Sequence, residues 1–138
     1  MSLFNRLTGG GETTLDSKAA ILLACITMIA ADGDIEDDEI AILRRIDGPH
    51  ESPAWNKALK AWKKHNLEEC VKLVAKFVDR SHVNPLMANL IDIAMADGNL
   101  AGREQQLLEA YMEALSPDPS RVEMYIEVIG DKNSVSTI

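Results

Sequence analysis

Aromatic residues are scarce in this chain of 138 residues, which holds two Trp, two Tyr and two Phe. Proteins that bind single-stranded nucleic acid stack bases on aromatic side chains, so this composition counts against such a surface. Basic residues are also the minority: 14 Lys and Arg face 22 Asp and Glu, and the formal net charge is −8. A phosphate backbone requires a basic face, so we expect no nucleic-acid partner. Cations, basic proteins and small ligands remain as candidate partners.

Cysteines and long apolar runs are few. Cys25 and Cys70 show neither the CxxC spacing nor the Cys/His spacing of a zinc site, so we expect two reduced thiols in the core. The longest apolar run covers residues 19–31, which is too short for a membrane span and fits a buried helix. The first residues lack the apolar stretch of a signal peptide, so the sequence predicts a cytoplasmic protein.

Catalytic motifs are missing as well. The sequence contains no Gly-rich phosphate loop, no Gly-x-Ser-x-Gly elbow and no Cys/His pair in a plausible context. We therefore expect a protein that is not an enzyme. A metal-dependent hydrolase that uses a pair of carboxylates is the alternative.

Apolar residues recur at close to 3.6-residue spacing nearly throughout, and strand-like alternation is never sustained. The sequence therefore predicts an all-α, single-domain bundle of about seven helices. Thr13 or Thr14 is expected to cap the first helix, and later caps are expected at Ser52-Pro53, Asn66, Asn84-Pro85 and Asp118-Pro119. The expected helices cover residues 13–32, 37–46, 53–64, 67–78, 85–97, 102–115 and 119–129. Residues 1–12 are expected to form a flexible arm, residues 13–129 the helical domain, and residues 130–138 a frayed tail.

Two segments of the chain repeat one another at an offset of 65 residues. Within residues 26–43 and 91–108, Ala31-Asp32-Gly33 matches Ala96-Asp97-Gly98, and Glu39 matches Glu104. Each copy reads as an apolar helix, an Ala-Asp-Gly turn and a second helix with Glu in its first turn. The sequence therefore predicts two pseudo-symmetric helical hairpins.

The duplicated carboxylates suggest a cation site. Asp32 is at the C-terminal end of a helix, where an anion is disfavoured, and the glycine after it allows the chain to reverse so that Glu39 returns to the same hairpin mouth. An all-oxygen ligand set without His or Cys suits Ca²⁺ or Mg²⁺ rather than zinc. In the alternative interpretation, each Glu only caps its helix, which contributes about 1 kcal/mol, and Asp-Gly is an ordinary turn. If the hairpins face each other, one pocket would gather Asp32, Asp34, Glu39, Asp97, Asn99 and Glu104.

The two Ala-Asp-Gly-(Asp/Asn)-(Ile/Leu)-x-x-x-Glu segments, each between paired helices, resemble the TerB-like domain of tellurite resistance. That domain is also similar to the N-terminal region of the membrane-anchored DnaJ-like co-chaperone. The resemblance covers residues 13–129. It implies an all-helical fold with internal pseudo-symmetry and an acidic pocket for divalent cations. It also implies a bacterial stress-response role with other stress-response proteins near the inner membrane.

Carried over position by position, the resemblance assigns that pocket to Asp32, Asp34, Glu39, Asp97 and Glu104. Where the family often has Ser/Thr-Pro-Glu-Glu, residues 36–39 read Glu-Asp-Asp-Glu and residues 101–104 read Ala-Gly-Arg-Glu, so the second copy lacks a good cap. This departure favours one shared site over two full sites, with Arg103 as a candidate internal counter-ion.

The middle third of the chain is basic, from Lys57 to Arg80. Lys72, Lys76 and Arg80 follow one another at four-residue spacing, which predicts a stripe along one helix face. One interpretation is a solvated face, and the other is a docking patch for an acidic partner or an anionic lipid. The alternative function is therefore a protein-interaction scaffold that docks partners through residues 57–80, with the acidic residues serving only as helix caps.

Overall fold

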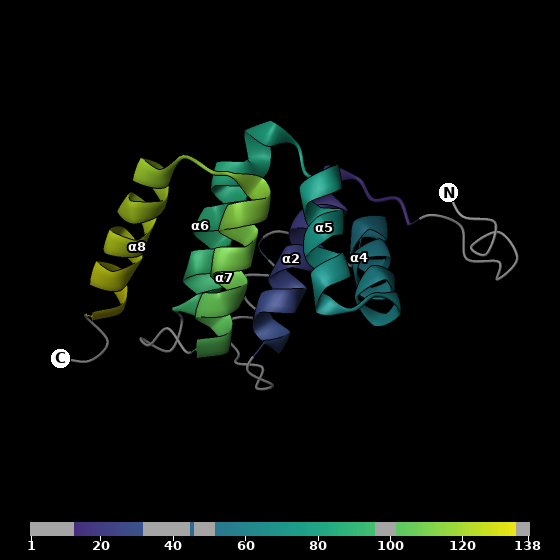
Figure 1. Ribbon diagram of the computed structural model, residues 1–138, viewed down its shortest axis with the longest axis horizontal. Coiled ribbons are helices and arrows are strands. Elements are labelled where there is room, and N and C mark those ends of the chain that lie inside the picture. Colours follow the sequence, from purple (N-terminus) through teal and green to yellow (C-terminus); the bar gives the residue numbers. More distant parts are fainter. Residues whose placement is uncertain (1–12, 32–44, 46–51, 96–101, 135–138) are drawn as a thin grey trace, which may run out of the picture.

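The computed structural model describes residues 13–31, 45, 52–95 and 102–134, and every regular element in these ranges is helical (Figure 1). The all-α fold class predicted from the apolar spacing is therefore confirmed. None of the helices in these ranges is long and apolar enough to cross a membrane. The elements are α2 (Ser17–Ala30), α4 (Pro53–Lys64), α5 (Leu67–Phe77), the 3-10 turn η1 (Arg80–His82), α6 (Val83–Ala94), α7 (Gly102–Leu115) and α8 (Pro119–Ser134).

Helix α2 is the core of the fold because it is apolar on nearly every side. Ten of its fourteen residues are buried, and it packs against α4, α5, α6 and α7. The prediction that residues 19–31 include a buried helix is confirmed. The predicted cap is wrong, however: Asp16 caps α2 by accepting the backbone N–H of Ala19 at 2.7 Å. Thr13 instead lies 2.8 Å from the ring of His65.

Helices α4 and α5 begin where the sequence predicts. The Ser52 hydroxyl accepts the backbone N–H of Trp55 at 3.3 Å, and Pro53 takes the first helical position, where its missing N–H costs nothing. Asn66 and Glu69 form a reciprocal capping box, with hydrogen bonds of 2.8 and 3.0 Å between each side chain and the other residue's N–H.

Helix α6 begins differently from the prediction. The turn η1 leads directly into Val83, so Asn84 is already inside the helix and its side chain accepts the N–H of Asp118 at 3.4 Å. The helix ends at Ala94, and Met95 closes its last turn through a backbone bond to Ile91.

Helix α8 is longer than its sequence pattern predicts. It continues through Gly130 to Ser134, so residues 130–134 belong to a helix rather than to a tail. The reason lies in a tertiary contact: the Asn133 amide donates to the carbonyl of Met95 at 2.6 Å, which ties this end of α8 to the end of α6.

The internal repeat is visible in the packing. Helices α2 and α6 occupy equivalent positions of the two copies and contact each other; α4 packs on α2, as α8 packs on α6. Each outer helix follows a cap-and-proline pair, Ser52-Pro53 and Asp118-Pro119. The outer helices lie at opposite ends of the molecule's longest axis, α8 at one end and α4 at the other (Figure 1).

Candidate functional site

One member of the predicted acidic site lies within the described residues. Glu104 is in the first turn of α7 and is 3% exposed. The N-terminal turn of a helix stabilises a negative charge, so the position suits a buried carboxylate. Arg103, beside it, is exposed, so it does not act as a buried counter-ion.

The remaining predicted ligands lie outside the described residues, so the structure does not place them relative to Glu104. Those residues are Asp32, Asp34, Glu39, Asp97 and Asn99. Within residues 13–31, 45, 52–95 and 102–134, no group of three or more His, Cys, Asp or Glu side chains could hold a metal ion.

The two cysteines are free and buried, as the sequence predicts. Burial raises the pKa of the Cys25 thiol to about 12. The pKa of Cys70 is raised to about 11, chiefly by burial and further by the negative charge of Glu69. Both groups are therefore neutral thiols near pH 7, and neither has the lowered pKa that an activated nucleophile needs.

Helix α4 presents a basic surface to solvent. Its inner side consists of the small residues Ala54, Ala58 and Ala61, which are at most 5% exposed and allow the helix to lie close against α2. Its outer side carries four exposed lysines and no acid. We call these four the α4 lysine face: Lys57, Lys60, Lys63 and Lys64.

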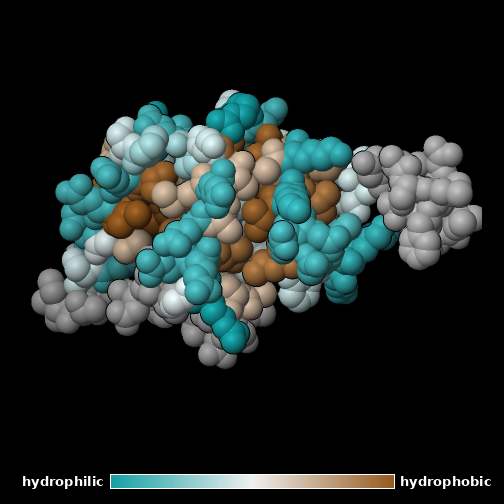
Figure 2. All heavy atoms as spheres, in the orientation of Figure 1, coloured by the Kyte–Doolittle hydropathy of each residue, from teal (hydrophilic) through white to brown (hydrophobic). Residues whose placement is uncertain are grey.

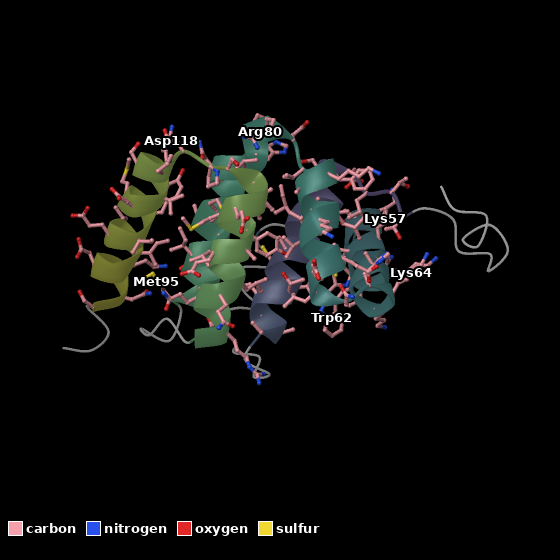
Figure 3. The ribbon with its side chains drawn as sticks, viewed as in Figure 1. Lys57, Trp62, Lys64, Arg80, Met95 and Asp118 are labelled. Atoms are coloured by element: carbon pink, nitrogen blue, oxygen red, sulfur yellow. The ribbon has the colours of Figure 1, made fainter. Side chains whose placement is uncertain are left out.

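Among the described residues, the Asp16 carboxylate lies near one lysine of this face. Lys57 Nζ lies 3.9 Å from the Asp16 carboxylate, and both side chains are about half exposed. In the part of the chain that the structure describes, no carboxylate forms an ion pair with Lys60 or Lys63. Lys57 and Lys64 lie along the outer edge of the molecule, and Trp62 is near the opposite end of α4 from Lys57 (Figure 3). The Trp62 side chain is 38% exposed and gives the face an apolar border.

The predicted stripe of Lys72, Lys76 and Arg80 is not continuous. Helix α5 ends at Phe77, and Val78 is extended, so Arg80 lies in η1 rather than on the same helix. Its guanidinium donates to the carbonyls of Leu115 at 2.5 Å and Ser116 at 3.4 Å. Arg80 therefore caps the C-terminal end of α7, and its side chain has a structural role.

The other two members of that stripe interact with neighbours on α5. Lys72 pairs with Glu68 at 3.6 Å, and the Lys76 ammonium lies 5.3 Å from the centre of the Phe77 ring. The basic middle of the chain thus separates into an exposed lysine face on α4 and side chains with local roles on α5 and η1.

The described histidines join the start of α2 to the helices around it. His65 contacts Thr13, while Nδ1 of His82 lies 2.8 Å from the Ser17 hydroxyl. That hydroxyl also accepts the N–H of Asp79 at 2.9 Å, so its own hydrogen is available for His82. Both histidines therefore make hydrogen bonds that hold the start of α2 in place.

The sequence shows that the middle of the chain is basic, but not that the basic and acidic segments lie at different ends of the fold. Residues 52–82 hold seven basic and three acidic side chains, a formal net charge of +4. Residues 102–134 hold three basic and seven acidic side chains, a net charge of −4. The signal was present in the sequence, but its meaning depends on α4 and α8 lying at opposite ends of the fold (Figure 1).

Comparisons of the chain with protein-family models, with curated proteins and with solved structures gave no match. The TerB-like resemblance therefore stays a prediction that depends on the two repeated segments.

Proposed function

We propose that the protein is a non-catalytic binding module that docks an acidic partner on the α4 lysine face. One observation carries this proposal: α4 exposes four lysines and no acid on a helix whose opposite side is fixed in the core by three buried alanines. Because the backbone of this helix is already ordered, binding loses little backbone conformational entropy, which favours association.

The four lysines would act together rather than singly. An exposed ion pair contributes only about 0.2–1 kcal/mol, so one lysine does not make a site. Several like charges on one face attract an acidic surface from a distance and raise the rate of association. Because such attraction is screened by salt, the interaction should weaken strongly as ionic strength rises.

Binding to a fluorescent polyglutamate peptide, followed by anisotropy, tests the proposal. We expect K60E/K63E to lose binding, whereas K72E/R103E keeps it. The control pair makes the same change in net charge on α5 and α7, so it separates the α4 face from general electrostatics. Equal binding by the wild type and both variants would contradict the proposal.

A second candidate function is the binding of a divalent cation by the acidic hairpin segments. The observation that favours it is the burial of Glu104 in the first turn of α7, within one of the two duplicated segments. A carboxylate held out of water is a stronger ligand for a hard cation than an exposed cap would be. The TerB-like resemblance supports the same proposal and adds a role in bacterial stress response and tellurite resistance.

Calorimetric titration with Ca²⁺, Mg²⁺, Mn²⁺ and Zn²⁺ tests the second candidate. We expect heat and a raised melting temperature with Ca²⁺ or Mg²⁺, and a loss of both in D32N/D97N and in E104Q. The control is E113Q, which removes an exposed carboxylate from the same helix as Glu104. Wild-type protein that shows neither heat nor stabilisation with any of these ions would exclude the site. Peptide docking that persists in chelator would separate the two candidate functions.

A further inference from the structure

Helix α8 leaves much of its apolar surface uncovered. Val122 is its only fully buried residue, while Met124, Ile126 and Val128 are 51%, 40% and 57% exposed. Among the described elements its principal neighbour is α6, whereas α4 packs on both α2 and α5. Apolar side chains accordingly reach the surface over α8 (Figure 2).

The exposed side of α8 combines apolar and acidic side chains in two parallel rows. Residues four apart lie above one another on a helix, so Met124 and Val128 form one row and Glu123 and Glu127 form the next. All four are exposed, and we call them the α8 outer face. A partner for this face needs apolar side chains beside positive charges.

Helix α4 offers that combination. Leu59 and Trp62 recur at helical spacing along one side of the helix, and Lys63, four residues after Leu59, borders that side. Trp62 is 38% exposed and Leu59 is half-buried. Exposed Trp and charged Lys together match the apolar and acidic rows of α8, and aromatic residues are enriched at protein interfaces.

The two faces also carry opposite net charges on a larger scale. Residues 52–82 have a net charge of +4 and residues 102–134 have a net charge of −4, and the outer helices of these segments lie at opposite ends of the long axis. The geometry of one molecule keeps its two faces apart. A second copy can bring them together, because the α4 end of one molecule can meet the α8 end of the next.

We propose that the protein associates with itself head to tail, with the α4 lysine face of one copy docked on the α8 outer face of another. The inference rests on the proposed function, since it names a second copy of this chain as an acidic partner of the same face. The contact is heterologous, so each added copy exposes a new α4 face and a new α8 face. The formal net charge of −8 repels whole molecules, and local complementarity makes the association selective for this orientation.

Sedimentation velocity over a range of protein and salt concentrations tests the proposal with a charge swap. We expect wild-type protein to grow in mean mass with concentration and to dissociate when salt is added. K60E/K63E and E123K/E127K should each remain monomeric, because the first keeps no net charge on its α4 face and the second has two basic faces. An equimolar mixture of these variants should associate, since the unaltered α4 lysine face of E123K/E127K then meets the unaltered α8 outer face of K60E/K63E.

Two further variants make the result specific. K72E/R103E has the same net charge as K60E/K63E and should associate like the wild type. M124S/V128S leaves every charge in place and should weaken association at least about tenfold, because it removes the apolar row. All of these positions are exposed, and circular dichroism would confirm that each variant is folded.

Two results would overturn the inference: wild-type protein that stays monomeric at every concentration, or a mixture of the swapped variants that is no larger than either alone. Binding to the polyglutamate peptide shows whether such a result refutes only self-association or also the proposed docking of an acidic partner on α4. A monomer that still binds the peptide through α4 refutes self-association alone. A monomer that does not bind the peptide refutes both.

Discussion

The hydroxyl groups of Thr27 and Tyr111 lie 2.6 Å apart in the core and join α2 to α7. Thr27 donates its hydrogen to the carbonyl of Ala24 at 2.7 Å, so its oxygen accepts the hydrogen of Tyr111. The two residues are 1% and 0% exposed. Water therefore does not replace this hydrogen bond while the protein is folded.

Removing either hydroxyl should destabilise the fold, and by different amounts. Tyr111→Phe loses one hydrogen bond and should lower the free energy of unfolding by about 1 kcal/mol. Thr27→Val leaves the Tyr111 hydroxyl buried without its acceptor and should cost about 1–3 kcal/mol. The double variant should cost less than the sum of the two, because nothing polar is then left unpaired. Urea unfolding measures all three, and strictly additive losses would contradict the geometry.

Because the two thiols are buried, we expect the free energy of unfolding to fall at high pH. The pKa values of Cys25 and Cys70 are raised by burial to about 12 and about 11, from an ordinary value of 9.0. Above pH 9 the unfolded chain loses these thiol protons while the folded chain keeps them. Ionisation then favours the unfolded state, so the free energy of unfolding should fall by about 1 kcal/mol per thiol by about pH 10.

Urea unfolding between about pH 8 and pH 10 measures this loss, and the loss should be fully absent below pH 8. A C25A/C70A variant serves as the control. Its core is less well packed, so its stability is lower throughout, but its dependence on pH over this window should be flatter. An equal slope in the variant and the wild type would assign the effect to other groups.

Much of the fold could be predicted from the sequence because its signals are local. Ser52-Pro53 and the Asn66 capping box fix the starts of α4 and α5 within a few residues of the chain. The wrong predictions fall where a residue distant in the sequence determines the start or the end of a helix. Asn133 extends α8 by binding Met95, and η1 moves the start of α6 ahead of Asn84.

Less of the candidate site could be predicted. The sequence shows that the middle of the chain is basic, but spacing alone places Arg80 on the same stripe as Lys72. The structure separates them, because Val78 is extended and Arg80 reaches the carbonyl of Leu115. Whether a lysine is available to a partner depends on tertiary neighbours, which periodicity does not reveal.

Arg80 should contribute to stability rather than to docking. The carbonyls at the end of a helix lack partners within that helix, and Arg80 supplies donors to Leu115 and Ser116. We expect Arg80→Met to lower the free energy of unfolding by about 1–2 kcal/mol. The control is Lys72→Met at an exposed position of α5, which should change the free energy of unfolding by less than about 0.5 kcal/mol. Folded R80M should bind polyglutamate as the wild type does. A loss of binding would show that Arg80 is part of the docking surface.

Ser116 follows α7 with a backbone φ of 49°, the left-handed conformation that favours glycine. The Cβ atom of any other residue is unfavourable there, and the side chain is exposed. Ser116→Gly should therefore raise the free energy of unfolding by up to about 1 kcal/mol, while Ser116→Val should lower it. Thermal unfolding of the two variants provides the measurement, and the reverse order would contradict the backbone geometry.

Asp92 on α6 occupies the repeat position that Thr27 has on α2, 65 residues earlier. Its carboxylate lies 3.7 Å from the Arg45 guanidinium and 3.6 Å from Lys132 Nζ on α8. Arg45 is one residue from the position equivalent to Tyr111. Each central helix thus directs one polar side chain at a residue of the other copy: Thr27 at Tyr111 by a hydrogen bond, and Asp92 at Arg45 by an ion pair.

Replacing Asp92 should therefore weaken the contacts that Arg45 and the Lys132 side chain of α8 make with α6. The Asp92 side chain is 18% exposed, so its ion pairs are less screened than those of a fully exposed carboxylate. We expect Asp92→Asn to lower the free energy of unfolding by about 1 kcal/mol at low salt and by less at high salt, since salt screens the attraction. Glu123→Gln removes an exposed carboxylate from α8 and should have little effect at either salt concentration. Urea unfolding of the two variants at both salt concentrations measures the difference. A loss in D92N that does not change with salt would show that its contribution is packing rather than charge.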